Sequence, residues 1–437
     1  MGMKYTEILD QASWGREHWK LFTVVSLNYI LNGVMFSVAP LLAYLIAPKK
    51  APLAFALNLI SETVGAVILG RLADIHGRRV MFAFSLTLEV LALLLLVPLY
   101  NNFIAFTVLT SLMTFGIGGE FGAAYSAIAE LVPAKHRGKV LMLSTNFWNI
   151  GAAMIAGLSL IYTAISEDIT LQIQYLLLSA LGTAVVAGLV RLAFPESPRW
   201  LVLRERVKEA EDLIKRITRY RGAIVFSEER VGNSFRYRIS LGTALSKYRF
   251  RFFILAIVTV SQYVTYNIAA YYLPYAPGFA FTLSIVPLLI FIANLGASIG
   301  AFMLLPLIDR ARRLTALLSF LGGAVTAILL LISHNTANLI AFCSALFINL
   351  IFSEWAWASL SVLQSELFPT SVRASIIGLL TGLTGISGAL IVYLSGFLVA
   401  RQYLSIVIGL WIAGLIAAAI WYFRGIESAQ RALEELV

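Results

Sequence analysis

The sequence predicts an all-α integral membrane protein with twelve transmembrane helices in two pseudo-symmetric six-helix halves. Three observations predict this fold: the composition is apolar, apolar runs of spanning length recur, and charged motifs appear twice. The 437 residues are 59% hydrophobic and 13% charged, and their mean hydropathy is +0.85. A soluble chain is typically about 45–50% apolar and about 25% charged. Because a soluble core cannot bury this excess, the apolar runs are interpreted as membrane spans.

Twelve apolar runs of suitable length follow one another along the chain. The first twenty residues are polar and charged, so we expect no signal peptide ahead of these runs. The predicted spans are 20–46, 52–73, 80–99, 102–130, 138–165, 172–194, 250–274, 279–306, 313–333, 337–366, 374–400 and 403–424.

A long polar segment between the sixth and seventh runs divides the spans into six and six. Apolar residues recur at helical spacing from Val202 to Arg219, which predicts surface helices there. The predicted parts are a cytoplasmic N-terminal segment 1–19, an N-terminal six-helix half 20–194, a cytoplasmic central loop 195–249, a C-terminal six-helix half 250–424 and a cytoplasmic tail 425–437.

The distribution of Lys and Arg predicts the orientation in the cell membrane. If the N-terminus is cytoplasmic, the outer loops contain only Lys49, Lys50 and Arg401, and the other 30 of the 33 basic residues lie on or near the cytoplasmic side. Both termini are therefore predicted to be cytoplasmic. The net charge of +10 then belongs to loops between spans, so we expect membrane lipid and no nucleic acid as a partner.

One charged motif occurs twice. ELVPAKHRG occupies 130–138 and ELFPTSVRA occupies 366–374, so that Glu, Leu, Pro and Arg return at a shift of 236. This shift relates Glu130 to Glu366 and Arg137 to Arg373.

A second motif repeats at nearly the same distance. GRLADIHGRR follows the second span and LLPLIDRARR follows the eighth, which relates Asp74 to Asp309 and Arg78 to Arg313 at a shift of 235. Because each copy follows the equivalent span, the chain is interpreted as a duplicated six-helix unit.

These motifs resemble those of the major facilitator superfamily. GRLADIHGRR looks like the loop motif between its second and third spans, and ELVPAKHRG and PESPRWL resemble motifs of the sugar-porter and metabolite-symporter branches. SQYVTYNIAAYYLP is similar to the sugar-porter pattern of the seventh span, and GIGGEFGAAYSAIAE looks like the metabolite-symporter branch. The resemblance covers nearly all of the chain. It implies transport by alternating access, with spans 1, 4, 7 and 10 lining the cavity.

The repeated charges predict a gate on the cytoplasmic side. Asp74, near the end of one helix, can accept hydrogen bonds from backbone N–H groups at the start of a facing helix. We expect one ion-pair cluster in each half, and we expect these clusters to hold the inner gate shut. The alternative is that they only anchor loops and fix topology. The gating residues are Asp74, Arg78, Glu130, Arg137, Asp309, Arg313, Glu366 and Arg373.

Four carboxyl groups are expected near the middle of the membrane, at a rise of about 1.5 Å per residue. They are Glu62, Glu89, Glu120 and Glu354, and an ionisable group at that depth is a functional candidate. Glu120 and Glu354 lie on the repeat-equivalent fourth and tenth spans, so both are expected to face the cavity. Glu89 is expected to pack between helices as a structural carboxyl.

Polar side chains at helical spacing predict the binding site. Tyr263, Asn267 and Tyr271 form one stripe of the seventh span, with Gln262 and Tyr266 beside it. Each could instead form an interhelical hydrogen bond worth about 0.6 kcal/mol. The predicted substrate-binding residues are Gln262, Asn267, Tyr271, Tyr266, Asn32, Asn149, Asn294, Glu354 and Trp357.

The same residues narrow the substrate class. No Lys or Arg is expected at mid-depth in any span, whereas an anionic substrate is usually bound by one. A neutral sugar or polyol fits amides, hydroxyls and aromatic rings. An organic cation also fits, held by carboxylates and cation–π contacts. An organic-acid symporter stays open as an alternative, because helix N-termini can partly replace basic side chains.

Proton coupling is assigned to carboxyl groups. The resemblance to proton-coupled sugar porters implies an Asp in the first span, but NYILNGVMF contains none there. The span-four Arg of sugar porters is also missing, with Thr110 and Ser111 in its place. Coupling is therefore assigned to Glu120, with Glu62 as the second candidate. An uncoupled facilitator is the alternative.

Other classes of function are not favoured. The four histidines show no metal-ligand spacing, Cys343 is the only cysteine, and no phosphate-binding loop occurs. We therefore expect no enzyme, no cofactor and no metal. A transporter-like sensor stays open. The chain is predicted to be a monomeric secondary transporter of a small polar solute, most simply a sugar:proton symporter, with an organic-cation or drug:proton antiporter as the alternative.

Overall fold

The computed structural model describes residues 3–191, 194–226, 239–394 and 397–437. Within these ranges, twelve helical segments are long and apolar enough to cross a membrane. Eleven of them are single helices or begin with a short 3₁₀ turn, and the seventh contains a π-helical turn. The spanning helices are α2 Arg16–Ile46, α3 Ala51–His76, α4 Arg78–Leu99, α5 Phe103–Leu131, α6 Arg137–Ile165, α7 Ile169–Arg191, α11 Arg249–Asn267, α12 Val286–Leu304, α13 Arg312–Asn335, α14 Leu339–Glu366, α15 Arg373–Leu394 and α16 Ala400–Arg424.

The twelve predicted spans are confirmed. Their ends agree with those in the structure to within four residues, except that the eleventh span ends at Leu394 rather than at 400. The short helical turns that join or extend spans are η1 Pro48–Lys50, η3 Ile268–Tyr272, η4 Leu273–Tyr275 and η5 Leu283–Ile285.

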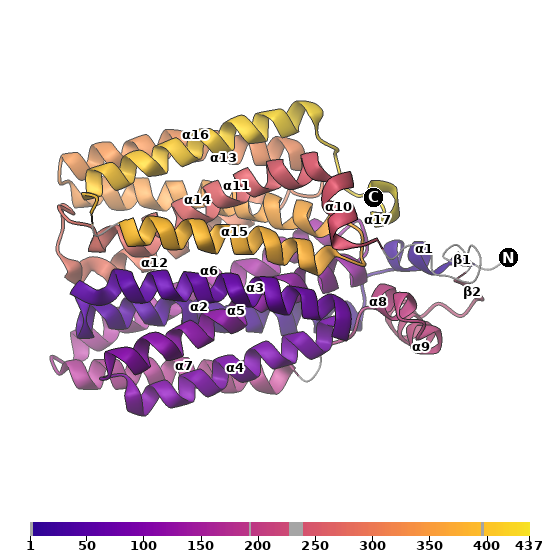
Figure 1. Ribbon diagram of the computed structural model, residues 1–437, viewed down its shortest axis with the longest axis horizontal. Helices are drawn as coiled ribbons and strands as arrows, with labels where there is room; N and C mark the ends of the chain where they lie inside the picture. The colour runs from indigo at the N-terminus through magenta and orange to yellow at the C-terminus, as the bar shows by residue number, and fades with distance from the viewer. Residues whose placement is uncertain (1–2, 192–193, 227–238, 395–396) are drawn as a thin grey trace.

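The spanning helices form two halves that lie side by side. In Figure 1, α2–α7 (indigo to magenta) make up one half and α11–α16 (red to yellow) make up the other. Both ends of the chain lie at one end of the bundle, called the terminal end below, together with α1 Tyr5–Asp10 and α17 Leu433–Leu436. The opposite end is called the far end.

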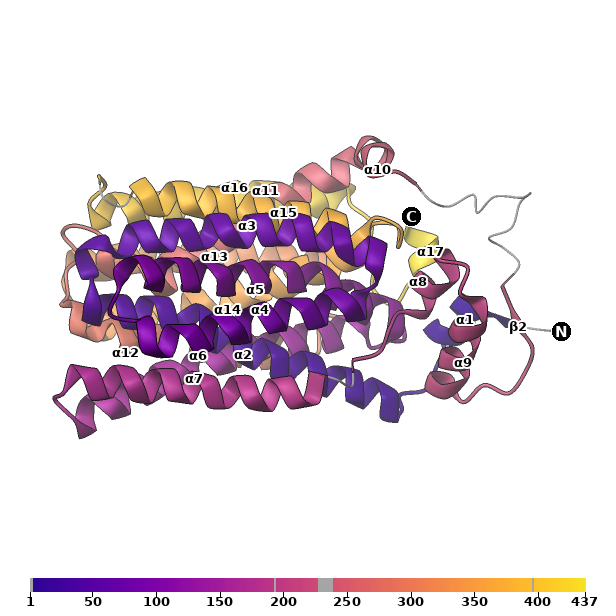
Figure 2. The ribbon, with the colours of Figure 1, turned by 60° about the horizontal axis from the view of Figure 1, so that its bottom comes forward.

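The central segment also lies at the terminal end (Figure 2). It contains α8 Pro198–Leu203, α9 Val207–Thr218 and α10 Leu241–Lys247, so the predicted surface helices are present. A short parallel pairing joins this segment to the start of the chain. In it, β1 Met3–Lys4 pairs with β2 Ile224–Val225.

The repeat is visible in how equivalent helices begin. Asn102 caps α5, where its side-chain oxygen accepts from the N–H groups of Ile104 and Ala105 at 3.0 and 3.1 Å. Asn338, which lies 236 residues later, caps α14 by accepting from Ala341 N–H at 3.0 Å. Both caps satisfy N–H groups that a helix start leaves without partners. The fourth and tenth spans are therefore built in the same way.

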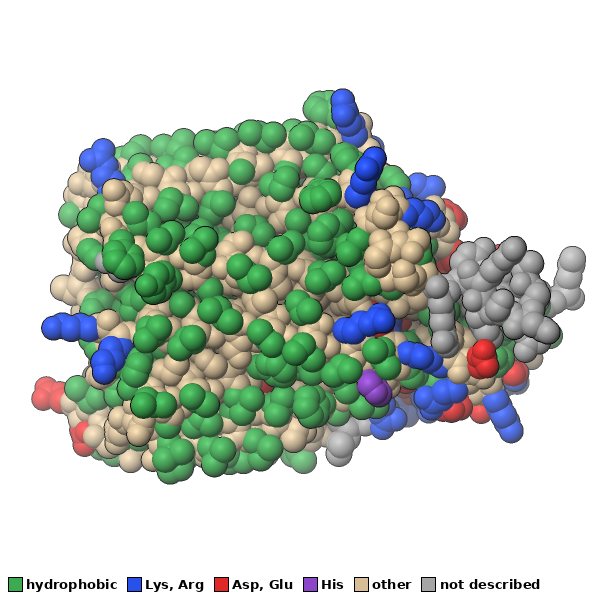
Figure 3. All heavy atoms as spheres, viewed as in Figure 1, with side chains coloured by type: hydrophobic (Ala, Val, Ile, Leu, Met, Phe, Trp, Pro, Cys, Tyr) green, Lys and Arg blue, Asp and Glu red, His purple; other side chains and the backbone are tan. Residues whose placement is uncertain are grey.

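The side of the bundle is apolar. Figure 3 shows hydrophobic side chains spread along the bundle, while most Lys and Arg side chains lie toward the terminal end. Mid-span residues such as Leu178, Val325 and Ile416 are 55–59% exposed. Soluble monomers rarely expose large contiguous apolar patches. This surface is suited to contact with lipid tails.

Glycines bring the two halves together along α3 and α15. A Cβ atom added at Gly378 on α15 would lie 2.2 Å from the carbonyl oxygen of Ala66 on α3. A Cβ added at Gly70 on α3 would lie 2.9 Å from the carbonyl oxygen of Ala374 on α15. Small residues permit this close approach of helix backbones. The halves therefore meet along a tightly packed line.

Candidate transport site and gate

A small cavity lies in the middle of the bundle, between the two halves. Its volume is about 40 Å³, which is room for a few water molecules. The structure thus contains the cavity in a contracted form, which must widen to hold a solute. It is lined by Tyr29 and Phe36 of α2, Phe121 of α5, Thr145, Trp148 and Asn149 of α6, Gln262, Tyr263, Tyr266 and Asn267 of α11, and Glu354 and Trp357 of α14.

Aromatic rings from both halves form most of the wall. The Phe121 and Trp357 rings meet edge to face across the halves, with their centroids 5.8 Å apart. Trp148 lies 5.2 Å from Phe36 and 6.2 Å from Phe121. Rings at these distances attract one another beyond their simple burial. The wall offers flat apolar faces to a solute.

Three polar side chains of the wall each have one oxygen that accepts no hydrogen bond from the described residues. Gln262 Nε2 donates to Ser353 Oγ at 3.1 Å, and Asn267 Nδ2 donates to the Tyr263 carbonyl oxygen at 2.9 Å. Glu354 Oε2 accepts from Asn149 Nδ2 at 2.8 Å. Among the described residues, Gln262 Oε1, Asn267 Oδ1 and Glu354 Oε1 are buried and have no hydrogen-bond partner. Tyr29 Oη, which can donate, also lies in this wall without a partner in the described part of the chain. Unpartnered acceptors therefore outnumber unpartnered donors among the described residues of the cavity wall.

Six of the nine predicted binding residues lie in this wall: Gln262, Asn267, Tyr266, Asn149, Glu354 and Trp357. Sequence reasoning did not select Tyr29, Phe36 or Phe121, because an aromatic residue in a span is most often a packing residue. Thr145 could have been selected, because it lies four residues before Asn149 on the same helix face, with Trp148 beside them.

Tyr271 and Asn294 lie behind the wall, contrary to prediction. The helix changes to a π-helical turn at Ile268–Tyr272, which breaks the spacing that placed Tyr271 on the stripe of Asn267. Tyr266 Oη donates to Asn294 Oδ1 at 2.8 Å and lies 3.3 Å from Tyr271 Oη. Both residues therefore position Tyr266 from behind.

Asn32 and Glu120 also lie outside the cavity wall. Glu120 forms a buried ion pair with Arg191, and Asn28 and Asn32 donate side-chain N–H groups to the same carboxylate. Arg191 also donates to Asn28 Oδ1 at 2.6 Å and covers the Phe82 ring at 3.8 Å. Glu120 is therefore not part of the wall that it was expected to face, and its partner Arg191 is a basic group that was not expected beside it. Arg191 is the last residue of α7, and its long side chain reaches inward to Glu120.

Glu62 does not line the cavity, but it contacts Tyr263, which does. Its Oε2 accepts from Tyr263 Oη at 2.5 Å, which links α3 of one half to α11 of the other. Glu89 is buried beside Gly116 of α5, in agreement with the expected packing between helices.

The predicted gate residues do meet at the terminal end, but their partners differ from prediction. Glu130 Oε1 accepts from Arg78 Nη2 at 3.1 Å in its own half and from Arg373 Nη1 at 2.8 Å in the other half. All three side chains are fully buried. The prediction of separate clusters within each half is therefore wrong, because Arg373 crosses to Glu130.

Glu366 shows the reciprocal arrangement. It pairs with Arg312 of its own half, and Arg137 Nη1 of the other half lies 3.6 Å from its Oε1. The predicted pairing of Arg313 is wrong, because that side chain is one third exposed and lies 3.7 Å from Glu427. Arg312 replaces it, since Asp309 and Arg312 are three residues apart whereas Asp74 and Arg78 are four apart.

The two aspartates also bridge the halves. Asp74 Oδ2 accepts from Ser375 N–H at 2.8 Å and from Ser375 Oγ at 2.6 Å, at the start of the facing helix α15. This contact confirms the predicted geometry. Asp309 accepts a longer bond from Lys139 N–H, at 3.4 Å, at the start of α6. Burial raises the pKa of Asp309, and Arg312 and Lys139 oppose that shift.

Residues outside the repeated motifs extend this cluster of charges. Asp10 of the N-terminal segment accepts from Arg137 at 2.7 Å and from Arg199 at 3.1 Å. Arg199 also pairs with Glu434 at 3.1 Å. Burial lowers the pKa of Arg199, but Glu434 and Asp10 outweigh it and raise that pKa above its usual value. The motif PESPRWL drew attention to the segment that contains Arg199, whereas no sequence motif indicated a role for Asp10 or Glu434.

Comparisons with known proteins agree with this architecture. The family described as "Sugar (and other) transporter" matches residues 43–437. The inner membrane metabolite transport protein YgcS of Escherichia coli is 32% identical over 197 residues, which are 43% of this chain and 42% of that protein. The niacin transporter NiaP of Acinetobacter baylyi is 26% identical over 389 residues, which are 84% of each chain. The structure of the proton:xylose symporter XylE bound to 6-bromo-6-deoxy-D-glucose superposes with a TM-score of 0.78 at 18% identity, covering 96% of this chain and 98% of that one.

Proposed function

Because this chain belongs to the family of sugar and other transporters, within the major facilitator superfamily, we propose that it carries a small polyhydroxylated solute, a sugar or polyol, by proton symport. As a member of that family it is a multi-pass membrane transporter and not an enzyme. The observation that carries the substrate proposal is the set of three buried acceptors without partners in the cavity wall.

A solute with several hydroxyl groups matches these acceptors. Each hydroxyl could donate to Gln262, Asn267 or Glu354, while an apolar ring face packs against Phe121 or Trp357. A buried acceptor left without a donor costs about 1–3 kcal/mol. A solute that lacks donors would leave that cost in place, so the wall favours donors over acceptors.

An organic cation is the second candidate, because Glu354 stands among aromatic rings. Its free Oε1 could pair with an ammonium group, and the rings would add cation–π attraction. An organic acid is the least favoured alternative. The described residues that line the cavity include no Lys or Arg, and Arg191 is already paired with Glu120.

The cross-half contacts support alternating access. Glu130–Arg373, Glu366–Arg137 and Asp74–Ser375 all join the two halves at the terminal end. For solute to leave on that side, these contacts must part. We place this side in the cytoplasm on the distribution of Lys and Arg, with both termini there.

Proton coupling is proposed at Glu120. Its carboxylate holds Arg191, Asn28 and Asn32, so protonation would break an ion pair that joins α2, α5 and α7. Glu62 is the second candidate, because its bond to Tyr263 crosses the halves and must change when they move. In proteoliposomes, Glu120→Gln should keep counterflow exchange and lose acid-driven accumulation. Unchanged accumulation would move the coupling role to Glu62, and no acid-driven accumulation by the unmodified protein would indicate an uncoupled facilitator.

A ligand panel tests the substrate class. A ligand that binds the folded state raises the apparent melting temperature of the detergent-purified protein. The panel contains neutral sugars and polyols, organic cations, dicarboxylates, and niacin and nicotinamide. We expect a sugar or polyol to stabilise the protein, and Gln262→Leu to weaken that effect more than Glu167→Gln, a change at an exposed residue outside the cavity.

The panel can also refute the proposal. Stabilisation by cations alone, removed by Glu354→Gln, would replace the sugar assignment with the cation one. Binding of a sugar without counterflow in proteoliposomes would indicate a sensor.

A further inference from the structure

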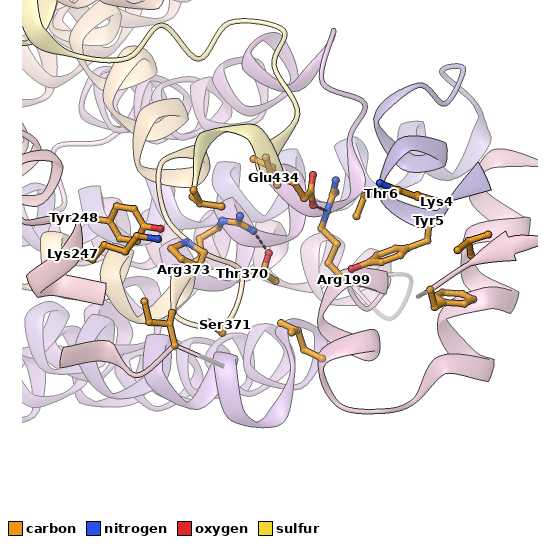
Figure 4. A pocket seen from close by; sticks show the side chains of 17 residues that line it. Lys4, Tyr5, Thr6, Arg199, Lys247, Tyr248, Thr370, Ser371, Arg373 and Glu434 are labelled. Carbon is orange, nitrogen blue, oxygen red and sulfur yellow. Dashed lines mark hydrogen bonds and ion pairs between the residues drawn. The ribbon is translucent and has the colours of Figure 1, made fainter. Parts of the chain in front are cut away.

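A second and larger pocket opens at the terminal end, away from the central cavity (Figure 4). Its volume is about 560 Å³, which is within the usual range of about 300–1,000 Å³ for small-molecule sites. The N-terminal segment, α8, the end of α10, the loop before α15 and the C-terminal segment all contribute to it. The proposed transport cycle gives this pocket no role.

The charge of the pocket is predominantly basic. The described charged residues that line it are Lys4, Arg199, Lys247, Arg373 and Glu434. Glu434 already pairs with Arg199 at 3.1 Å. Burial tends to raise the pKa of Glu434, but Arg199 outweighs it and lowers that pKa, so the carboxylate stays engaged with its partner. Lys247 lines the pocket and forms no ion pair with another described residue, so it makes the pocket attractive to an anion.

Arg373 supplies donors that the protein does not use. Its Nη1 donates to Glu130 Oε1 at 2.8 Å and to Thr370 Oγ1 at 3.1 Å. Its Nε and Nη2 have no partner among the described residues, although the side chain is fully buried. Ser371 Oγ in the same loop likewise has none. Figure 4 shows Arg373 reaching toward Thr370, with Lys247 and Tyr248 on the same side of the pocket. Unused buried donors are costly, which points to a ligand that accepts from them.

Part of the pocket wall is apolar. The Tyr5 and Phe226 rings stack with their centroids 5.5 Å apart, and Leu203 and Leu433 lie in the same wall. An inorganic anion alone would leave these surfaces uncovered. The combination fits an anion that carries an apolar body.

We infer that this pocket binds an organic phosphate, whose oxygens accept from Arg373, Ser371 and Lys247 while its apolar part packs against Tyr5 and Phe226. Arg and phosphate form strong charge-assisted hydrogen bonds. Arg373 is also the residue through which Glu130 joins the two halves. A bound phosphate therefore stabilises the closed terminal end and slows transport. The binding step is independent of the proposed substrate.

Thermal unfolding of the full chain in detergent tests the binding step with phenyl phosphate as the probe. Phenyl phosphate should raise the melting temperature, inorganic phosphate should do so more weakly, and benzyl alcohol should not. Lys247→Gln should raise the apparent Kd for phenyl phosphate about fivefold, and Ser371→Ala should raise it also. Lys208→Gln removes an equally exposed charge on α9, outside the pocket, and should leave the Kd unchanged. Failure of both phosphates to stabilise the protein, or equal weakening by Lys208→Gln, would overturn the inference.

Two further measurements identify the source of the phosphate and its effect. In nanodiscs of phosphatidylcholine with and without phosphatidate, stabilisation by phosphatidate to which phenyl phosphate adds nothing further assigns the site to a lipid headgroup. Stabilisation by phenyl phosphate equally in both assigns it to a soluble phosphate. In counterflow, phenyl phosphate on the terminal side should slow exchange by the unmodified protein, and about fivefold more of it should be needed to slow Lys247→Gln to the same extent. Binding without slowing would refute the link to the gate, and it would leave the proposed transport function untouched.

Discussion

Glu130 is the residue whose change tests the gate most directly. It accepts from Arg78 and Arg373, and all three side chains are fully buried. In Glu130→Gln, Arg78 keeps the carboxylate of Asp74 at 3.1 Å, whereas Arg373 keeps only neutral acceptors, Thr370 Oγ1 and the new amide oxygen. The change therefore leaves Arg373 as a buried cation without an anionic partner, but only while the terminal end is closed.

The size of the effect follows from that burial. Removing one partner of a buried ion pair costs about 3–5 kcal/mol. When the terminal end opens, water hydrates Arg373 and most of this cost disappears. A difference of about 3 kcal/mol corresponds to a shift of about a hundredfold toward the open form.

Thiol labelling measures this shift. Ser361 is buried on α14 between Glu354 of the cavity and Glu366 of the gate. A cysteine at this position, in a Cys343→Ala background, should react with a membrane-impermeant reagent from the terminal side only when that end opens. Glu130→Gln should raise the labelling rate by about a hundredfold, and Glu366→Gln should raise it in the same direction.

Glu211→Gln is the matched control, because Glu211 forms an exposed pair with Lys215 at 2.6 Å. Such a pair contributes about 0.2–1 kcal/mol and has no part in the gate. If both gate variants remain folded by thermal unfolding and label no faster than this control, the charge clusters only anchor loops, and the gating argument fails.

Three further predictions concern pH, packing and the buried ion pair. Burial raises the pKa of Asp309 in the closed gate, so the closed state binds a proton on Asp309 more tightly than the hydrated open state does. Protonation of Asp309 therefore favours closure. This contribution is fully present below an ordinary Asp pKa of about 3.9 and is lost as the pH rises through the raised pKa. Labelling of the Ser361→Cys protein should therefore slow on acidification. With Asp309→Asn added, labelling should be slow already at neutral pH and should not depend on pH. If Asp309→Asn leaves the pH profile of labelling unaltered, Asp309 is not the group that titrates. Gly378→Val should lower stability by about 1–3 kcal/mol, because its side chain would meet the Ala66 carbonyl oxygen; Gly409→Val, at a site with nothing within 4 Å, should not, and equal melting temperatures would refute the packing argument. Arg191→Met should destabilise the protein by about 3–5 kcal/mol, and adding Glu120→Gln should restore part of that loss; a strictly additive double variant would show that the two residues are not coupled.

The sequence alone was sufficient to locate the twelve membrane spans. Span length and apolarity are local properties, so the runs of about 20 residues predicted the twelve helices with ends that mostly agree to within four residues. The duplication was likewise visible, because Asp74, Glu130 and Arg137 return as Asp309, Glu366 and Arg373. Helical spacing also placed Asn149, Gln262 and Asn267 in the cavity wall.

The tertiary structure alone decided which of these charged and polar groups meet. Arg373 and Arg137 exchange their expected partners, Arg191 reaches Glu120, and a π-helical turn moves Tyr271 off its stripe. The reason is physical: an arginine side chain is long enough to reach several carboxylates. Its choice depends on how helices far apart in the sequence are placed, and periodicity within one helix carries no information about that placement.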